Sequence, residues 1–385
     1  MNILFLSSWY PTVNNPSFGV FVKEHAAAIH TTGNNLVVLA LVVQKSKKIF
    51  SVSYSEKIDE NGVRTVTAEV YTRFFDIVHH AVPIQYWYMK KIYEKCVAPN
   101  FNPDIIHANV IFPCGIMGYW FSQNLKKPLF ITEHWTRVAR FAKQPFLSRW
   151  GKAAYKHAAA IMPVSRYLQS NIQTAFGIDA QKFYPVGNII DTDKFQYKSK
   201  EKADDVIKLC SIATWNKMKT PAKQPELLIK AIGLLPENMR QKIYLTMVGG
   251  GDKLDELKAL CALTGVNTEF TGYLPKEKIA HILQESHFFV HPTLIETFGV
   301  VIAEALSTGT PVICSNVGAL PELVNETNGV LCENTLEDWV EAIKKAFSVN
   351  FDNKKIAEDV NNKYSKETIG KEIYTVYVNN TSVAL

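Results

Sequence analysis

The feature that most constrains this chain is a repeated order in which a short apolar run precedes a segment with helical spacing. The runs have the length of strands. Strands that alternate with helices in this way form a mostly parallel sheet with helices on both faces, so the sequence predicts an α/β fold. In the first half we expect strands at residues 2–8, 36–43, 64–72, 104–109, 129–134, 159–165 and 183–190, and helices at 20–29, 84–95, 113–125, 146–159 and 166–176.

The same order repeats in the second half of the chain, after a charged stretch at residues 197–205 that we interpret as a linker. A length of 385 residues suits two domains. We therefore expect two Rossmann-like domains, each with ligands at the carboxyl ends of its strands. Strands are expected at 207–214, 243–251 and 268–274, and helices at 224–235, 252–264, 276–283, 336–347 and 365–378.

The most informative stretch of the second half is residues 287–313, HFFVHPTLIETFGVVIAEALSTGTPVI. A buried strand is expected at 287–291, because the apolar run stops at Pro292. Thr297 suits the N-cap of a helix at 299–307, and Gly309 suits a left-handed cap at its end. The next strand begins at 310–313.

Two glutamates bracket the start of that helix. Apolar residues surround Glu304 on the helix, and a carboxylate buried there needs a partner. Glu296 lies in the loop before the helix, and the backbone amides of Phe298, Gly299 and Val300 between them form an anion site. The alternative is that Glu296 only complements the helix dipole and Glu304 forms an ion pair in the core.

The pattern ETFGxxxxEAxxxGxPVI resembles the donor-site signature of the retaining GT-B glycosyltransferases of family four, the glycosyl transferases group 1. The resemblance implies that Glu296 contacts the donor sugar. It implies that the amides of Phe298 to Val300 hold the donor diphosphate. It also implies that Glu304 holds the ribose hydroxyls.

The resemblance extends to residues 185–195, PVGNIIDTDKF, which are similar to the segment that ends the first domain of that family. It implies a GT-B fold with a cleft between an acceptor domain at 1–190 and a donor domain at 191–365. The last helix, 366–385, is then expected to pack back on the first domain. We interpret Asp191-Thr192-Asp193 as a structural turn and not as the Asp-x-Asp metal motif of GT-A enzymes, so no metal site is predicted.

A loop in the second half carries cations between a strand and a helix, where they can neutralise a diphosphate leaving group. The family pattern has an arginine, and then a lysine followed by glycine. Lys223 matches the lysine, although Gln224 replaces the glycine. The arginine is missing, and either Lys217 or Lys219 supplies the second charge or both are ordinary surface lysines. We select Lys223 as a catalytic residue and Lys219 as a donor-binding residue.

Two further candidates lie in the first half. Gly19 by itself indicates only a turn, but the resemblance implies that its backbone meets the donor phosphates. His107 and His134 are both expected at the carboxyl ends of strands, which line ligand sites. The segment ITEHW is similar to the family segment whose histidine lies in the reaction pocket, so we select His134 as a catalytic residue.

The charge of the chain is uneven. Residues 1–185 carry 20 Lys and Arg against 10 Asp and Glu, whereas the remainder carries 22 against 26. Aromatic residues alternate with cations at 84–95 and 137–152, which suits either an anionic membrane surface or an ordinary solvated basic face. No nucleic-acid motif accompanies the charge. Scattered cysteines and the lack of a basic leader predict a cytoplasmic protein, with contact at the inner face of the membrane.

The resemblance and these residues together predict a retaining hexosyltransferase. It would move a sugar from a nucleotide-diphosphate donor to a glycan or polyprenyl-linked acceptor in cell-surface polysaccharide synthesis, without a metal or another cofactor. Two alternatives stay open. One is a GT-B nucleotide-sugar epimerase or phosphorylase, although no pyridoxal-lysine segment is evident. The other is a non-catalytic nucleotide-sugar-binding partner, because the cation loop is altered and fold alone does not imply function.

Overall fold

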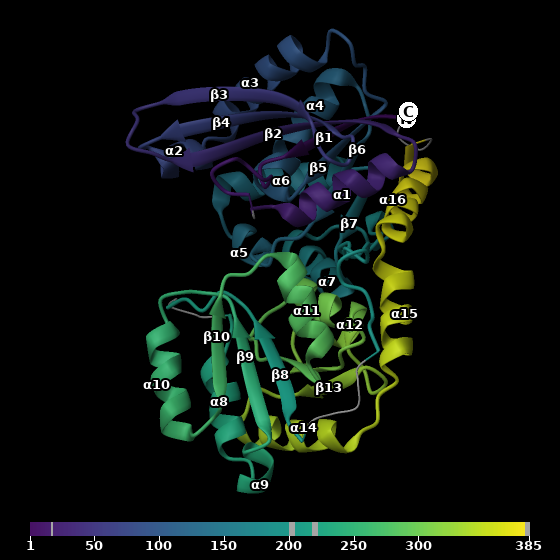
Figure 1. Cartoon of the computed structure of the whole chain (residues 1–385). Helices are drawn as coiled ribbons and strands as arrows, with labels where there is room; N and C mark the ends of the chain where they lie inside the picture. The colour runs from purple at the N-terminus through teal and green to yellow at the C-terminus, as the bar shows by residue number, and fades with distance from the viewer. Residues whose placement is uncertain (17, 200–204, 218–221, 382–385) are drawn as a thin grey trace. The chain divides into compact units, whose positions relative to one another are not determined.

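A computed structural model of the chain describes residues 1–16, 18–199, 205–217 and 222–381. The chain divides into two compact units. The first consists of Met1–Ile189 together with Lys366–Leu385, and the second of Ile190–Ser365. Both units are shown in Figure 1.

The first unit is built on a seven-stranded sheet in the order β3-β4-β2-β1-β5-β6-β7. All neighbouring strands are parallel except β3, which pairs antiparallel with β4 at one edge. The order of the sheet reverses between β1 and β5, which are neighbours. The strands are β1 (Asn2–Ser7), β2 (Asn35–Lys45), β3 (Ser51–Ile58), β4 (Arg64–Thr72), β5 (Ile105–Asn109), β6 (Leu129–Glu133) and β7 (Ala160–Pro163).

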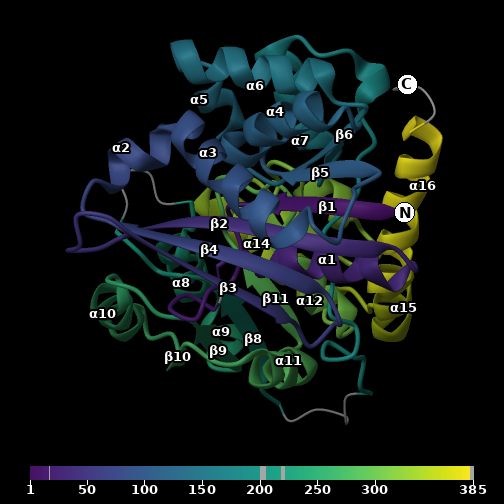
Figure 2. The same ribbon diagram turned by 90° about the horizontal axis from the view of Figure 1, so that it is seen from above.

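Helices cover both faces of this sheet, as right-handed crossovers require (Figure 2). Helices α3, α4 and α6 pack in a row on one face, and α1 packs with α16 on the other. The bounds are α1 (Val20–Thr31), α2 (Phe75–His80), α3 (Val82–Ile92), α4 (Ile116–Leu125), α5 (Val138–Phe141), α6 (Pro145–His157), α7 (Arg166–Phe176) and α16 (Lys366–Thr381). Single-turn helices lie at Tyr93–Val97, Ile111–Gly115 and Ala180–Lys182.

The last helix, α16, belongs to the first unit although it is the end of the chain. Its Gly370 lies so close to α1 that an added Cβ would be 2.4 Å from the Ala28 carbonyl oxygen. Its Tyr377 is buried and hydrogen-bonds with His107 of β5. The end of the chain therefore completes the core that the beginning of the chain starts.

The second unit has a six-stranded sheet in the order β10-β9-β8-β11-β12-β13, in which all neighbours are parallel. Numbered from one to six along the chain, this is the order 3-2-1-4-5-6 of a dinucleotide-binding Rossmann fold. The order reverses between β8 and β11. The strands are β8 (Ile207–Ile212), β9 (Ile243–Val248), β10 (Thr268–Gly272), β11 (Phe288–His291), β12 (Val312–Ser315) and β13 (Gly329–Cys332).

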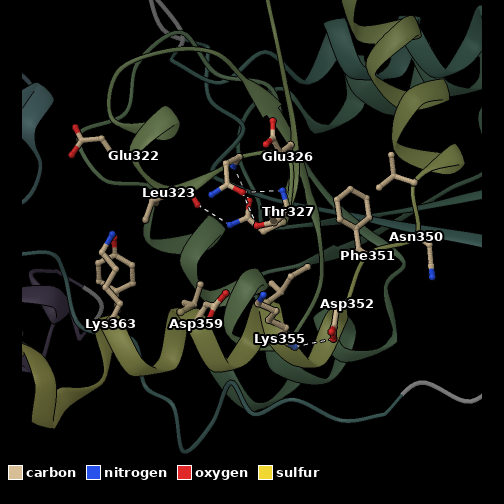
Figure 3. Close-up of a pocket in the computed structure, with 16 residues that line it drawn as sticks. Glu322, Leu323, Glu326, Thr327, Asn350, Phe351, Asp352, Lys355, Asp359 and Lys363 are labelled. Atoms are coloured by element: carbon tan, nitrogen blue, oxygen red, sulfur yellow. Dashed lines mark hydrogen bonds between the residues drawn. The ribbon is translucent and has the colours of Figure 1, made fainter.

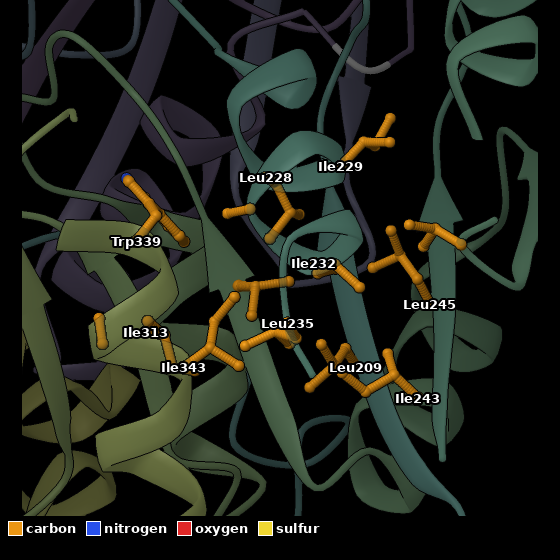
Figure 4. Packing of buried hydrophobic residues seen from close by; sticks show 14 of the residues in the cluster. Leu209, Leu228, Ile229, Ile232, Leu235, Ile243, Leu245, Ile313, Trp339 and Ile343 are labelled. Atoms are coloured by element: carbon orange, nitrogen blue, oxygen red, sulfur yellow. The ribbon is translucent and has the colours of Figure 1, made fainter. Parts of the chain in front are cut away.

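The core of the second unit lies between the sheet and two helices, α8 and α14 (Figure 4). Ile229 and Ile232 of α8 and Trp339 and Ile343 of α14 are buried in one cluster with Leu209 of β8. Helix α12 packs between α11 and α15. The bounds are α8 (Pro225–Gly233), α9 (Glu237–Arg240), α10 (Leu254–Thr264), α11 (Lys276–Glu285), α12 (Val300–Ser307), α13 (Leu320–Leu323), α14 (Leu336–Ser348) and α15 (Asn353–Tyr364).

The prediction of an α/β fold with two Rossmann-like domains is confirmed. One strand was missed, and two local predictions are wrong. Strand β3 was not expected, because its alternation is weak and most of its side chains are exposed. No strand forms at residues 183–190, where the only described pairing is a bridge between Ile161 and Phe183. His107 lies in the middle of β5 and not at its carboxyl end.

Candidate active site

The functional candidates of the second unit meet where the strand order reverses, between β8 and β11. Ligands of open α/β sheets bind outside the carboxyl ends of strands at such a point. Lys223 lies between β8 and α8, and an isolated antiparallel bridge pairs it with Thr293 just beyond β11. His291 is the last residue of β11, and Glu296 follows in the loop that leads to α12.

Lys223, His291 and Glu296 form a hydrogen-bonded cluster. The Lys223 ammonium forms an ion pair with Glu296 Oε1 and lies 2.9 Å from His291 Nε2. His291 Nε2 is also 3.2 Å from the same carboxylate oxygen. Because an ammonium only donates and a carboxylate only accepts, the neutral His291 nitrogen serves one of these partners at a time. Thr293 Oγ1 accepts a further bond from Lys223 at 3.4 Å.

Backbone hydrogen bonds fix the two loops that carry this cluster. The Gln224 N–H donates to the Pro292 carbonyl at 3.0 Å, and the Leu294 N–H donates to the Ala222 carbonyl at 2.7 Å. These two bonds lie on either side of Lys223. The loop after β8 and the loop after β11 are therefore tied together, which holds the lysine beside Glu296.

Strand β12 and the loop after β13 hold the other side of Thr293. The Thr293 N–H donates to Ser315 Oγ at 2.8 Å, and the Ser315 hydroxyl donates to Asn334 Oδ1 at 2.7 Å. The Asn334 amide closes the ring by donating to the Thr293 carbonyl at 2.8 Å. Sequence reasoning missed Ser315, Asn334 and His291, because each follows or ends a strand without a recognisable motif of its own.

The electrostatics of the cluster fix its charge at neutral pH. Burial and the neighbouring Lys223 charge lower the pKa of His291 to about 4, although Glu296 opposes the shift. Burial alone would raise the pKa of Glu296, but the hydrogen bond with His291 and the charge of Lys223 outweigh it and lower that pKa to about 2. Glu296 is therefore an ionised acceptor, and His291 is neutral.

Helix α12 presents its amino end to the same loop. Gly299 is its N-cap, with a φ of 92°, and the predicted N-cap at Thr297 is wrong. The left-handed backbone places the N-cap two residues later than predicted, and only glycine adopts it without strain. The N–H groups of Ile302 and Ala303 donate to the Gly299 carbonyl, so the helical ladder begins there. The earlier amides have no acceptor within the helix.

The remaining predicted donor residues surround this helix start. Glu304 lies on α12 with 8% of its surface exposed, as its apolar neighbours predict. Phe298 is buried, and its ring packs edge-on against Tyr364 at 5.2 Å. Val300 is the first residue of the helix and is partly exposed. The second unit thus gathers Lys223 and Glu296 on two paired loops, and Phe298, Val300 and Glu304 at the adjoining helix.

The second cation of the loop is not found among the described residues. Lys219 lies outside the described residues. Lys217 forms an exposed ion pair with Glu256 at 2.6 Å. Trp215, near the position at which the family has arginine, is buried in the core. Lys217 is thus engaged on the surface by another partner, and Lys223 is the cation that the structure places at the switch point.

The candidates of the first unit lie at the carboxyl edge of its sheet. His134 follows β6 directly, is buried, and lies 4.7 Å from the ring of Phe21 and 5.1 Å from that of His25. Gly19 is the N-cap of α1, two residues before Phe21, and has a φ of 70°. The structure therefore brings Gly19 and His134 to one place.

The structure gives Gly19 a packing role. A Cβ at this position would be 2.3 Å from the Trp9 carbonyl oxygen, so only glycine allows α1 to begin against the loop after β1. This requirement explains the glycine without a ligand. Contact between its backbone and donor phosphates remains a prediction.

Glu133 positions the loops on either side of His134 and was missed by sequence reasoning. It is fully buried at the end of β6. Its carboxyl group accepts hydrogen bonds from the backbone N–H groups of Ile111, His134 and Trp135 and from the Tyr155 hydroxyl, all at 2.8–2.9 Å. Burial raises the pKa of Glu133, whereas the four donors favour its ionised form. A buried acid immediately before a site histidine is the signal that could have revealed it.

Buried histidines make the first unit sensitive to acid. Burial lowers the pKa of His25 to about 4 and that of His107 to about 3. An unfolded chain binds protons at these residues below about pH 6.5, whereas the folded unit keeps them neutral, so the free energy of unfolding falls as the pH falls. We expect a loss of about 2 kcal/mol for each histidine between pH 6.5 and 5.

Thermal unfolding at several pH values checks this prediction. His107→Gln should flatten the dependence of the unfolding temperature on pH, whereas His281→Gln, at an exposed histidine, should leave it unchanged. Equal slopes in the wild type and His107→Gln would contradict it.

A separate pocket of about 460 Å³ lies between the loop that leads into β13 and helix α15 (Figure 3). Its lining combines acids such as Glu326 and Asp359 with Lys355 and Lys363. None of the predicted site residues lines it.

Within the described ranges, His, Cys, Asp and Glu form no group of three that could hold a metal ion. No helix in that part of the chain is long and apolar enough to span a membrane.

Two doubly wound units, each with polar residues at the carboxyl edge of its sheet, define a two-domain protein of the Rossmann-like class. Each half of the chain also matches a family model: residues 193–364 match Glycosyl transferases group 1, and residues 19–194 match Glycosyltransferase Family 4. Together the two matches cover residues 19–364 and support a GT-B glycosyltransferase of group 1.

Known proteins show the extent of this likeness. The chain is 27% identical over 221 residues to a phosphatidylinositol N-acetylglucosaminyltransferase chain of Arabidopsis thaliana, a match that covers 56% of this chain and 48% of that protein. It is 24% identical over 351 residues to the putative teichuronic acid biosynthesis glycosyltransferase TuaC of Bacillus subtilis. That match covers 86% of this chain and 85% of TuaC. The chain thus spans about half the length of the first relative and most of the second.

A solved structure shares the fold. The chain resembles Anabaena HepE in complex with UDP and glucose with a TM-score of 0.69, over 98% of this chain and 100% of that one. The two sequences are 17% identical, so this likeness shows the fold alone.

Proposed function

We propose that this protein is a retaining hexosyltransferase that transfers a sugar from a nucleotide-diphosphate sugar to a glycan or polyprenyl-linked acceptor. The observation that carries the proposal is the cluster of Lys223, His291 and Glu296 beside the amino end of α12, at the switch point of the second sheet. The matches to the family models and the UDP and glucose in the HepE complex support a nucleotide-sugar donor.

The donor diphosphate would lie against the amino end of α12. The amides there, from Phe298 to Val300, carry the positive end of the helix dipole and suit an anion. Lys223 would add a full positive charge from the neighbouring loop. Glu304, buried four residues along the helix, would accept hydrogen bonds from the ribose hydroxyls.

Transfer would break the bond between the anomeric carbon and the diphosphate oxygen and form a bond to the acceptor oxygen on the same face of the sugar. The acceptor proton would pass to the departing phosphate oxygen. Lys223 and the helix amides would stabilise the negative charge that develops there. Glu296, ionised at neutral pH, would orient the sugar by accepting hydrogen bonds from its hydroxyls.

His134 and Gly19 of the first unit would contact the two substrates. His134 is neutral because burial lowers its pKa well below the usual value, so it would hydrogen-bond the sugar or acceptor without carrying charge. Gly19 would bring backbone close to the donor phosphates. Metal independence is part of the proposal, since Lys223 and the amides supply the charge that a divalent ion would otherwise provide.

The setting of the reaction follows from the family and the charge of the first half. TuaC is named as a putative teichuronic acid biosynthesis glycosyltransferase. We place this chain in cell-surface polysaccharide synthesis, in the cytoplasm at the inner face of the membrane. A lipid-linked acceptor would be met there.

Calorimetric titration with UDP-, GDP- and ADP-sugars tests the donor site. One nucleotide class should bind the wild type, and Glu304→Ala should weaken that binding about 10-fold to 100-fold, because hydrogen bonds to a charged group contribute about 1.5–3 kcal/mol. Glu326→Ala, an exposed acid in the separate pocket, is the matched control and should bind normally. Equal losses in both variants, or none in Glu304→Ala, would remove Glu304 from the site.

A non-catalytic nucleotide-sugar-binding protein is the second candidate. The observation that favours it is the exposed pairing of Lys217 with Glu256, which leaves Lys223 as the cation described at the switch point. Donor hydrolysis without an acceptor distinguishes the two, because only an enzyme releases the nucleotide diphosphate. Analysis of the sugar products distinguishes a transferase from an epimerase or phosphorylase.

A further inference from the structure

Six exposed apolar side chains gather around α2 and α3 of the first unit. They come from the loop before β3, from the residue before α2, and from the two helices, which follow each other in Figure 2. Ile77 is the most exposed, at 68%. We call this set the α2–α3 patch, and its members are Ile49, Phe50, Phe74, Ile77, Ile84 and Trp87.

Hydrogen bonds and ring contacts make the patch continuous. The Thr72 hydroxyl donates to the Ile49 carbonyl at 2.7 Å, which ties the loop before β3 to the end of β4. The ring of Phe50 lies 5.5 Å from that of Tyr88 on α3, and Tyr88 lies 4.8 Å from Trp87. These contacts place the loop before β3 beside β4 and α3, and α2 lies against α3.

The same elements are strongly cationic. Residues 46–50 and 73–92 contain five Lys or Arg and a single acid, Asp76. Two of the cations lie directly on aromatic rings of the patch: the Lys91 ammonium is 3.8 Å from the centre of the Trp87 ring, and the Arg73 guanidinium is 4.8 Å from that of Phe74. Charge and apolar area are thus combined on one surface.

The structure also separates this surface from aromatic residues that serve the core. Tyr86 of α3 packs edge-on against Trp120 and Phe121, and Trp120 packs against Trp150 of α6. These rings join helices α3, α4 and α6 to one another. The aromatic residues that the sequence grouped together are therefore of two kinds, and Trp87 belongs to the exposed one.

We propose that the α2–α3 patch docks on an anionic lipid bilayer. Apolar side chains flanked by Lys and Arg suit the boundary between headgroups and acyl chains, where the rings enter and the cations meet lipid phosphates. The excess of five cations over one acid selects an anionic surface over an uncharged apolar partner. No described helix can span a membrane, so the contact is peripheral.

Sedimentation with lipid vesicles tests the proposal without donor or acceptor, so its outcome is independent of the proposed transfer reaction. The protein should bind vesicles of phosphatidylcholine mixed with phosphatidylglycerol at low salt and should not bind phosphatidylcholine alone. Raising the salt to about 0.5 M should weaken the binding, because charges near a surface are then screened. Failure to bind the anionic vesicles would overturn the proposal.

Matched variants locate the contact. Ile77→Ser combined with Trp87→Ser should lower the vesicle partition coefficient at least about tenfold, since each side chain loses buried apolar area. Leu263→Ser is the control, because Leu263 is an 83% exposed leucine in the second unit. Circular dichroism and unfolding temperature establish that the variants are folded. Equal binding by the patch variant and the control would overturn the proposal.

A second copy of this chain is the other occupant that the test distinguishes. Light scattering of the wild type and the patch variant reports the oligomeric state in solution. A wild-type dimer that the patch variant abolishes would assign the surface to self-association and overturn membrane docking. A monomer in both cases, together with the vesicle result, would support it.

Discussion

Lys223→Met is expected to lower kcat about 10²-fold to 10³-fold, because it removes the cation placed to stabilise the departing diphosphate. Donor affinity should fall by less, since the helix amides and Glu304 remain. Turnover of the donor identified by calorimetry is the measurement. Lys253→Met is the matched control: Lys253 is also partly buried and paired with a glutamate, Glu226, but lies outside the cluster.

Loss of stability could imitate this effect, because the variant leaves the Glu296 carboxylate without its main partner. The double variant Lys223→Met/Glu296→Gln removes both charges and should recover the unfolding temperature without recovering turnover. Near wild-type turnover in Lys223→Met would exclude the proposed role.

Glu133→Leu should destabilise the first unit by about 4 kcal/mol, because it leaves buried backbone N–H groups at three residues without their acceptor. The three residues, Ile111, His134 and Trp135, belong to the loops at the carboxyl edge of the first sheet. Urea unfolding measures the change. The loss should be accompanied by lower activity, since His134 is no longer held in place.

Tyr155→Phe is the graded comparison. It removes one donor from Glu133 and leaves the three backbone bonds intact, so we expect a loss of about 1 kcal/mol. If Glu133→Leu were no more destabilising than Tyr155→Phe, Glu133 would not be the residue that fixes these loops.

The fold was largely accessible from the sequence, because the spacing of apolar residues determines where strands and helices form. Helix α12 and the burial of Glu304 followed from the apolar residues around it. Strand β3 escaped prediction because it is an edge strand whose side chains are mostly exposed. Its position depends on pairing with β4, which local sequence does not encode.

The site was only partly accessible for a related reason. Glu296, Lys223 and the start of α12 carry a recognisable pattern, and the structure brings Lys223 and Glu296 together. His291 joins them because β8 and β11 are neighbours in the sheet, although they are far apart along the chain. The N-cap of α12 is Gly299 and not Thr297, because backbone conformation, and not a side-chain cap, decides it there.

The return of α16 to the first unit has a consequence for biosynthesis. A ribosome releases the chain from its amino end, so every element of the second unit emerges before α16. Until α16 emerges, the surface of α1 at Ala28 lacks Gly370, which packs against it, and His107 lacks its hydrogen-bond partner Tyr377. The first unit begins to be translated first but can complete its core only after the second unit has emerged. Its unfinished core therefore stays exposed to aggregation for longer than that of the second unit.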